Sequence, residues 1–368
     1  MQILQLKLIN FRNYKQIQFN FSPKKNIILG NNGLGKTNIV EAIYYLALTK
    51  SFRVNNDIFL INNESNYSIV EGQVKETIKN DYKIIIENKN KRVFINNNQV
   101  KKLSDYISKI NIISFNPEDL KLIKDSPNIH RQLINIEISQ FDNNYLKNLS
   151  IYNKILKQRN SYLKNLSFKK NYNIEYLYIL TDKLIDYGIN IYNLRKLYIE
   201  NINIYLNIYF KKITNKDGLY LKYVSNYDNL NKDELIKKYK NLYQTDINYG
   251  KTTFGIHLDD FIFYYQTEIA KNYLSEGELK NVVIAFKLAE INIFINIKKK
   301  IPILILDDLF SEIDSGKINK IFKLLKKNLQ IFITTTDINN IDNKTLQNSK
   351  IFKLKNNGIE EIIYEWTL

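Results

Sequence analysis

The sequence contains no cysteine and only two histidines, His130 and His257. These absences exclude disulfide bonds and cysteine-based zinc sites, and the histidines are too few for a metal cluster. Long hydrophobic runs are also missing, since apolar stretches such as 301–306 stop at charges, well short of the roughly 20 residues that cross a bilayer. The N-terminus lacks the basic-then-apolar layout of a signal peptide. We therefore expect a soluble cytoplasmic protein with no membrane partner.

The charge is strongly of one sign. The 368 residues include 54 Lys and Arg against 37 Asp and Glu, which gives a net charge of +17. This excess favours a polyanionic partner, such as nucleic acid or an anionic membrane surface. Lys, Asn, Ile and Tyr are abundant together, which A+T-rich coding DNA also produces, so the charge supports DNA binding without establishing it. The length predicts two domains, or one domain with a large insertion.

The first part of the chain, residues 1–115, has the pattern of a sheet. Apolar and polar residues alternate through 16–21, and 27–29 is a short apolar strand. From Thr37 the apolar positions recur at three and four residues, which predicts a helix. A strand, a loop and a helix therefore follow one another in the order that a phosphate-binding loop needs.

The middle part, residues 116–250, is predicted to be helical. Ser126 and Pro127 are typical of a helix start, and apolar residues recur at helical spacing through 142–210. The spacing is too irregular and too short for a long coiled-coil arm. Strands return in the last part, residues 251–368, which we expect to complete one α/β domain with the first part. The middle part is then a helical lobe inserted into that domain.

A phosphate-binding loop follows the strand at 27–29. The pattern G-x-x-x-x-G-K-[ST] is matched in full by Gly30, Asn31, Asn32, Gly33, Leu34, Gly35, Lys36 and Thr37. Its glycines let the backbone curl so that N–H groups face phosphate oxygens. Lys36 supplies a positive charge at the β- and γ-phosphates, and the Thr37 hydroxyl is a ligand for Mg²⁺. An ordinary glycine-rich turn has no need of Lys-Thr at a helix start, so we predict ATP binding here, with Asn38 as an additional contact.

The apolar segment 301–306 ends in two carboxylates, Asp307 and Asp308. Such a strand brings an acid to the rim of a parallel sheet beside Mg²⁺. Alone, a turn or a helix cap explains such a pair, but the phosphate-binding loop upstream favours the functional interpretation. We predict that Asp307 holds Mg²⁺ through water and that Asp308 orients or deprotonates the attacking water.

Ser275 and Gly277 stand before a strongly apolar predicted helix, within the pattern Leu-Ser-x-Gly. The hydroxyl and the backbone donors there can cap the helix or grip a γ-phosphate. The order of phosphate-binding loop, Leu-Ser-x-Gly and carboxylate strand is similar to that of ABC-type ATPases, in which Leu-Ser-x-Gly touches the nucleotide held by the other subunit. We therefore predict that Ser275 and Gly277 complete the site of a partner copy.

Nearly the whole chain resembles the RecF family, bacterial recombination-repair ATPases with a short-armed SMC-like head. The segments that carry the resemblance occur in the family's order, at 10–14, 30–37, 41–46, 51–53, 115–120 and 307–314. The resemblance implies an α/β, ABC/SMC-like ATPase head with mixed sheets and an inserted helical lobe. It also implies nucleotide contacts from Arg12, from Asp314 in a loop that crosses the dimer seam, and from Thr335 near the γ-phosphate.

The same resemblance implies a function and partners. Each loop would hold one ATP with Mg²⁺, so that ATP binding closes a homodimer on duplex DNA at the edge of single-stranded gaps. Slow, DNA-stimulated hydrolysis would reopen the dimer. RecR, with RecO as a further candidate, would be recruited, and the loading of RecA would be helped indirectly.

The sequence departs from the family pattern at three places. In the segment 124–131, Asp125 stands for the usual Gly and His130 for the usual first Arg. Ser-Arg-Gly-Gln or Ser-Gln-Gly-Gln is usual where this chain has acids at Glu276 and Glu278, and like charges weaken the approach of a polyphosphate. Gly-Pro-His-Arg-Asp-Asp is replaced by a segment with Ile256 and Leu258, which loses an arginine and any contact that it made. His257, which lies between them, is more typical of a structural histidine than of a catalytic one.

Two other interpretations remain open at the level of sequence. The energy subunit of a transporter would share the phosphate-binding loop, Leu-Ser-x-Gly and the carboxylate strand. A scaffold that binds ATP without hydrolysing it would also suit the acidic Leu-Ser-x-Gly segment. Stimulation of ATP turnover by duplex DNA would argue against a transporter subunit. Turnover that is measurable and is lost in Asp308→Asn would argue against a scaffold that does not hydrolyse ATP.

Overall fold

The computed structural model describes residues 1–88, 90–168, 174–308, 315–325, 328–338, 341, 346, 349–355 and 358–364. The chain divides into two compact units. Unit 1 comprises Met1–Leu120, Ile208–Lys216 and Lys280–Leu368, and unit 2 comprises Lys121–Asn207 and Asp217–Leu279. No helix within the described residues is long and apolar enough to cross a membrane.

The units differ in three places from the division that the sequence predicts. The first is small, because residues 116–120, expected in the helical lobe, belong to unit 1. Residues 251–279, expected in the head, belong to unit 2. The reason is pairing: β10 (Asp260–Tyr265) lies antiparallel to β9 (Leu219–Val224), and both strands belong to this unit. Residues 208–216, expected in the helical lobe, belong to unit 1. An apolar pattern identifies a strand, but it does not say which sheet the strand joins.

Unit 1 contains an antiparallel sheet in the order β2-β1-β4-β5-β6-β7. These strands span Tyr14–Asn20, Gln2–Phe11, Tyr67–Lys75, Lys79–Glu87, Asn90–Ile95 and Asn98–Gln99. Their side chains alternate between buried and more exposed positions, as in β4, because one face packs on the core. Short 3-10 turns occur in this unit at η1 (Asp57–Leu60), η2 (Leu103–Asp105) and η3 (Pro117–Leu120).

A second sheet of unit 1 carries the segments of interest. Its order is β15-β14-β3-β13-β12-β8, with β15 antiparallel and the other pairs parallel. The strands span Gly358–Tyr364, Ser349–Lys355, Lys25–Leu29, Ile331–Thr335, Ile303–Leu306 and Ile112–Phe115. β12 is apolar and buried throughout, and β13 is also buried throughout but ends in two threonines, as expected for a sheet covered on both faces with polar groups at its edge.

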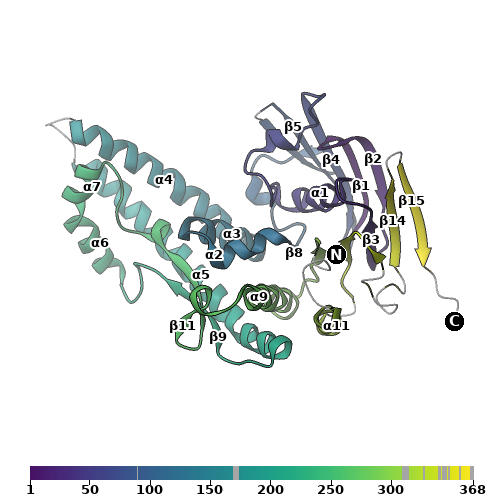
Figure 1. The fold of residues 1–368 in the computed structure, drawn as a ribbon. Coiled ribbons are helices and arrows are strands. Elements are labelled where there is room, and N and C mark those ends of the chain that lie inside the picture. Colours follow the sequence, from purple (N-terminus) through teal and green to yellow (C-terminus); the bar gives the residue numbers. More distant parts are fainter. Residues whose placement is uncertain are drawn as a thin grey trace. The chain divides into compact units, whose positions relative to one another are not determined.

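Helix α1 (Lys36–Leu48) lies between the two sheets of unit 1 (Figure 1). Nearly every residue of α1 is buried, including Ile39, Ile43 and Leu46. A helix that is buried all round is apolar all round, which explains why its sequence shows little amphipathic contrast. The remaining helices described in this unit are α11 (Ser315–Leu324) and most of α9 (Glu276–Asn296).

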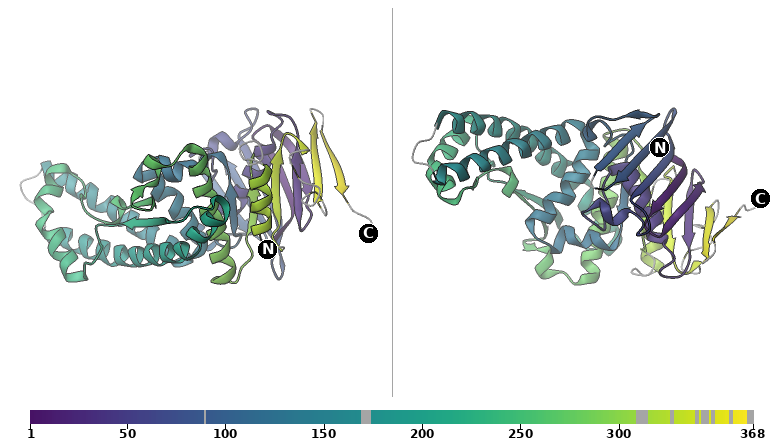
Figure 2. Two further views of the ribbon diagram at one scale, coloured as in Figure 1. Left: turned by 60° about the horizontal axis from the view of Figure 1, so that its bottom comes forward. Right: turned by 90° about the horizontal axis from the view of Figure 1, so that it is seen from above.

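Unit 2 is mainly helical (Figure 2). Its helices are α2 (Lys121–Lys124), α3 (Pro127–Phe141), α4 (Asn143–Phe168), most of α5 (Ile174–Thr214), α6 (Lys232–Asn241), α7 (Tyr243–Tyr249) and α8 (Ala270–Tyr273). The predicted helix start at Ser126 and Pro127 is confirmed, because Pro127 is the first residue of α3. Helix α5 folds back along α4, where Arg159 Nε donates to Thr181 Oγ1 at 3.1 Å.

A small sheet completes unit 2, in the order β11-β10-β9, with β11 at Glu268–Ile269. Beside it, the turn η4 (Ile256–Leu258) contains both Ile256 and Leu258 of the departing segment. His257 in this turn lies 2.9 Å from the Tyr152 hydroxyl through Nδ1 and 3.2 Å from the Thr252 carbonyl oxygen through Nε2. Both ring nitrogens thus have partners within the unit, which supports a structural role for His257.

Candidate nucleotide site

The predicted site residues converge at the carboxyl edge of the parallel sheet. The phosphate-binding loop follows β3, Asp307 follows β12, and Thr335 ends β13. Because these three strands run parallel, their carboxyl ends meet at one edge of the sheet. The convergence is held by backbone pairing, since Gly30 N–H donates to the Thr335 carbonyl at 3.3 Å.

Two glycines give the loop its curl. Gly33 has φ +85° and Gly35 has φ +89°, both in the left-handed region that side-chain-bearing residues rarely adopt. At Gly35 space is also short, since a Cβ there would lie 2.7 Å from Asn13 Nδ2 and 2.8 Å from the Tyr14 hydroxyl. That hydroxyl donates to the Gly35 carbonyl at 3.1 Å and holds the loop from behind. Asn13 and Tyr14 were not predicted in this role, because the β1–β2 turn reaches the loop only in the folded unit.

Lys36 begins α1 and is buried at the loop. Its ammonium donates to the Asn31 carbonyl at 3.0 Å and to Asn32 Oδ1 at 3.5 Å. Burial lowers the pKa of Lys36, while the nearby carboxylates of Asp308 and Asp307 raise it. Oxygens of Asn31 and Asn32 thus hold the Lys36 ammonium at the place where phosphate oxygens of a bound nucleotide would contact it. The two asparagines orient Lys36 in addition to forming part of the loop.

Thr37 and Asp307 meet across the edge of the sheet. The Thr37 hydroxyl donates to Asp307 Oδ1 at 3.2 Å, and the Thr334 hydroxyl donates to the same oxygen at 2.7 Å. Asp307 is only 3% exposed, so burial raises the pKa of its carboxyl, and the hydrogen bonds from Thr334 and Thr37 oppose that rise. A hydroxyl and a buried carboxylate side by side are the hard oxygen donors that Mg²⁺ prefers, so these residues fit the predicted ion.

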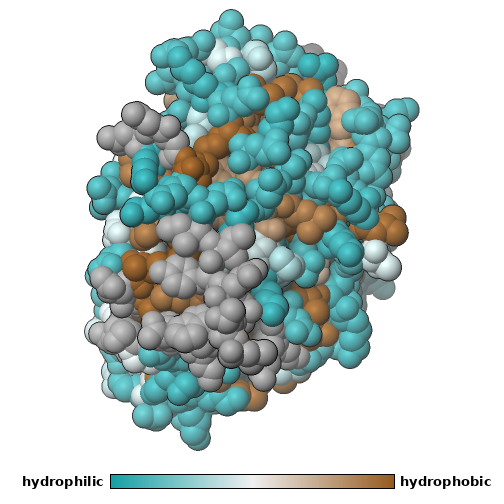
Figure 3. Space-filling model, turned by 90° about the vertical axis from the view of Figure 1, so that its right-hand side faces the viewer, coloured by the Kyte–Doolittle hydropathy of each residue, from teal (hydrophilic) through white to brown (hydrophobic). Residues whose placement is uncertain are grey.

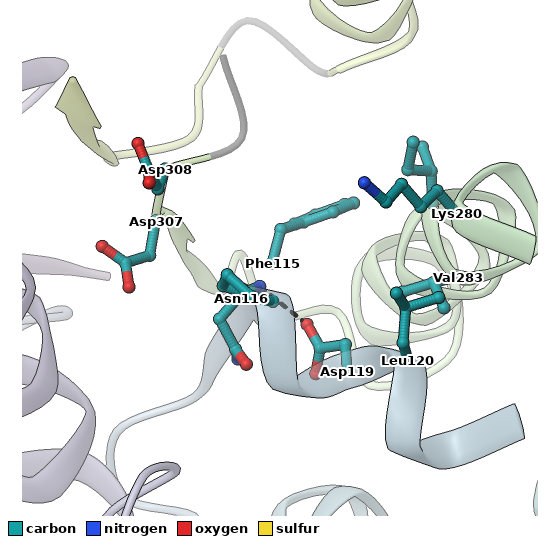
Figure 4. A pocket seen from close by; sticks show the side chains of 10 residues that line it. Phe115, Asn116, Asp119, Leu120, Lys280, Val283, Asp307 and Asp308 are labelled. Atoms are coloured by element: carbon teal, nitrogen blue, oxygen red, sulfur yellow. Dashed lines mark hydrogen bonds between the residues drawn. The ribbon is translucent and has the colours of Figure 1, made fainter. Parts of the chain in front are cut away.

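Asp308 has a strained backbone at the end of the same strand. Its φ is +53°, and its N–H donates to Thr334 Oγ1 at 2.9 Å. Asp308 and Asp307 line one end of a cavity of about 40 Å³, whose other end holds Leu120, Val283 and Lys280 (Figure 4). Thr334 therefore contacts the carboxylate of Asp307 and the backbone of Asp308. Within the segment 334–336, which the family resemblance places near the γ-phosphate, the Thr335 hydroxyl donates to the Asp337 carbonyl. Its contact with a nucleotide stays a prediction.

Arg12 is held away from solvent by a carboxylate of α1. Its Nε and Nη2 donate to Glu41 at 3.0 and 2.6 Å, and Nη1 donates to the Phe59 carbonyl at 2.9 Å. Glu41 is fully buried and also accepts from the Ser51 hydroxyl at 2.5 Å. Each of the three guanidinium nitrogens of Arg12 thus donates to the protein, and the contact of Arg12 with a nucleotide stays a prediction. Glu41 makes the cluster possible and was not singled out from the sequence.

The remaining predicted residues are distributed unevenly. Asn38 lies in the first turn of α1, where its amide donates to Asn13 Oδ1 at 2.8 Å and its oxygen accepts from Arg53. A groove of about 400 Å³ lies beside the loop and is lined in part by Lys353 and Lys355. These two lysines were not predicted from the sequence as site residues. Asp314 lies outside the described residues.

Ser275 and Gly277 belong to unit 2, at the start of α9. The backbone N–H and the hydroxyl of Ser275 both donate to Glu278 Oε2, at 2.9 and 2.8 Å. Glu276 lies 3.5 Å from the Lys124 ammonium. The two acids of the departing segment thus cap and brace the start of α9, and Gly277 has open space around the position of a side chain.

Comparison with known proteins gives matches over nearly the whole chain. The family described as the RecF/RecN/SMC N terminal domain matches residues 2–360. The DNA replication and repair protein RecF of Clostridium perfringens is 37% identical over 365 residues, which cover 98% of this chain and 100% of the relative. Its counterpart in Halalkalibacterium halodurans is 34% identical over 370 residues, with 98% and 100% covered.

Solved structures extend the likeness to the fold. The recombination mediator protein RecF-ATP in the RecFOR pathway has a TM-score of 0.90 at 28% identity, over 98% of this chain and 97% of that chain. An SMC head bound to the C-winged helix domain of ScpA has a TM-score of 0.54 at 16% identity, over 99% and 98% of the two chains, which bears on the fold alone. The predicted ABC/SMC-like α/β head is therefore confirmed.

Proposed function

Since this chain belongs to the RecF family, we propose that it is an ATP-dependent DNA-binding protein of recombinational repair and replication. The observation that carries the proposal is the meeting of Thr37 with Asp307 beside the buried Lys36. A phosphate-binding loop, a hydroxyl and a carboxylate at one sheet edge form the minimal arrangement for a nucleoside triphosphate with its metal. The solved relative bound to ATP supports the same ligand for this chain.

The proposed reaction is hydrolysis of ATP to ADP and phosphate. Mg²⁺, when bound by Thr37 and, through water, by Asp307, neutralises charge on the β- and γ-phosphates. Lys36 binds the same phosphates, and the N–H groups of the loop orient them. Asp308 accepts a proton from water as the water oxygen bonds to the γ-phosphorus and the bond from that phosphorus to the ADP oxygen breaks. An Asp here is one methylene shorter than the Glu of most ABC ATPases, which supports slow turnover.

We propose that ATP also holds two copies together. Ser275 and Gly277 of each copy would complete the site of the other, with Ser275 exchanging its bond to Glu278 for one to the γ-phosphate. Asp314 of the dimer seam is part of this proposal. Nucleotide binding would then close the dimer on duplex DNA, and hydrolysis would reopen it.

The partner in this proposal is duplex DNA at the edge of a single-stranded gap. The net charge of +17 supports it, because neutralised phosphates release condensed counterions. Affinity for duplex DNA should therefore fall steeply with salt and should be higher with ATP than without nucleotide. The closed dimer presents a composite surface that the monomer lacks, so RecR, with RecO as a further candidate, should prefer the ATP state and help RecA to load.

A decisive experiment measures ATP turnover and dimer mass together, with and without duplex DNA. We expect DNA to raise turnover and ATP to double the mass. Recovery of RecR on gapped DNA should be higher with ATP than with ADP, or than with the Lys36→Ala protein. Equal recovery of RecR in the three cases would rule out recruitment that depends on the nucleotide. ATP turnover that is the same with and without duplex DNA would rule out the proposed DNA clamp.

The transporter alternative loses support. The RecF relatives match along their whole length, which includes segments outside the ATPase motifs. A subunit that docks on membrane helices would present a broad apolar patch. On the face in Figure 3, apolar residues form narrow bands between hydrophilic ones. Turnover that depends on duplex DNA would complete the distinction.

A further inference from the structure

Unit 2 contains a small cavity that the nucleotide chemistry does not use. Its volume is about 70 Å³, and it lies among α2, α3, β10, β11 and α8. The walls are mostly apolar, with Ile123, Ile262, Phe263 and Ile269 among them. One water needs about 10–15 Å³, so the space suits a group of several heavy atoms.

His130 brings a buried polar atom to this cavity. The residue is 4% exposed, and its Nδ1 lies 2.8 Å from Asp260 Oδ1. Its other nitrogen, Nε2, has no hydrogen-bond partner within the part of the chain that the structure describes. Leaving a buried polar atom unpaired costs on the order of 1–3 kcal/mol, and native proteins rarely do so. An atom that occupies the cavity is the natural partner.

The charges of the lining favour an anion. Asp260 is paired with His130, and the further charged side chain of the lining is Lys271, which is exposed. The Asp260 carboxylate already faces His130 Nδ1, so Nε2 is the ring nitrogen left for a ligand, and the ammonium of Lys271 is the charge left for one. A single positive charge above apolar walls suits a monoanion with a short aliphatic body rather than a polyanion.

We propose that this cavity binds a small aliphatic carboxylate, either free or at the C-terminus of a peptide. The carboxylate would accept from His130 Nε2 and pair with Lys271, and the aliphatic part would pack on Ile262, Ile269 and Phe263. This site lies wholly within unit 2 and is independent of ATP, so its test stands apart from that of the proposed function.

The chain offers a clean spectroscopic test, because His130 and His257 are its only histidines. In histidine-selective NMR of the whole protein, butyrate at constant ionic strength should shift the His130 signals saturably, with a dissociation constant on the order of millimolar. The His257 signals should stay in place, since both of its ring nitrogens are engaged elsewhere. His130→Gln assigns the signals, and His257→Gln assigns them if the first variant does not fold.

Two surface lysines of unit 2 provide matched variants. Lys271→Gln should weaken butyrate binding about tenfold, as expected for loss of one ion pair, whereas Lys251→Gln should leave it unchanged. The peptide Gly-Gly-Ala against its C-terminal amide tests the peptide source. Three outcomes would each overturn the proposal. The first is that the His130 signals move neither with butyrate nor with the peptide. The others are that Lys271→Gln binds butyrate as tightly as the wild-type protein does, or that the His130 signals respond more strongly to inorganic phosphate than to butyrate.

Discussion

The hydroxyl of Thr37 donates to the carboxylate of Asp307 at 3.2 Å, although 270 positions separate the two residues. The bond joins the first turn of α1 to the end of β12. It also partly offsets the burial that raises the pKa of Asp307. A carboxylate kept buried and oriented in this way is ready for a cation.

Lys36→Ala should abolish ATP binding and, with it, ATP-dependent dimerisation. The variant removes the main side-chain cation for the phosphates, and we expect at least about a hundredfold loss of affinity, or about 3 kcal/mol. Nucleotide binding measured by calorimetry and dimer mass measured by light scattering check this. Lys15→Ala, at an exposed lysine paired with Glu64, is the control and should behave as wild type. An ATP-dependent dimer that persists in Lys36→Ala would contradict the site.

Asp308→Asn should have a different effect from Lys36→Ala. The phosphate grip remains while the proton acceptor for water is lost, so turnover should fall about a hundredfold or more. The ATP-bound dimer should persist longer, as measured by its dissociation after excess ADP is added. Dissociation as fast as in wild type would mean that Asp308 does not act on the water, and unchanged turnover would mean that another residue does.

Glu41→Gln should destabilise unit 1. The substitution leaves the Arg12 guanidinium without the buried charge that now receives two of its hydrogen bonds. Breaking a buried ion pair in this way costs about 3 kcal/mol, which urea titration would detect. Glu64→Gln is the matched control, because its pair with Lys15 is exposed, and it should change the unfolding midpoint little or not at all. Equal midpoints for the two variants would show that the Arg12 cluster adds no stability.

Acid should destabilise the fold through His257. Burial lowers the pKa of His257 from 6.5 to about 4, so the folded chain keeps this ring neutral where the unfolded chain takes up a proton. The unfolded state thus binds more protons between these values, and stability falls as the pH drops through this window, by about 3 kcal/mol. In His257→Gln the unfolding free energy should change less between neutral pH and about pH 4.5. If the unfolding free energy of His257→Gln changed with pH as steeply as that of the wild-type protein, the acid sensitivity would belong to other groups.

The phosphate-binding loop could be predicted residue by residue, because its glycines, Lys36 and Thr37 act through local backbone geometry. The partners of these residues could not. Thr334 rather than Thr335 contacts the acids, since the register of β13 against β3 decides which of two adjacent hydroxyls faces Asp307. The buried Glu41 pairs with Arg12, and nothing in the local sequence marks Glu41 as its partner.

The sequence by itself determined the chemistry of the loop, the carboxylates at the end of an apolar strand, and the starts of α1, α3 and α9. These features depend on residues that are neighbours in the chain. Only the tertiary structure decided that Thr37 and Asp307 touch, that residues 251–279 join the helical unit, and that His130, whose Nε2 has no partner among the described residues, lines a cavity. Each of these depends on which strands pair and which faces pack, and such long-range choices are set by the energy of the whole fold rather than by any local segment.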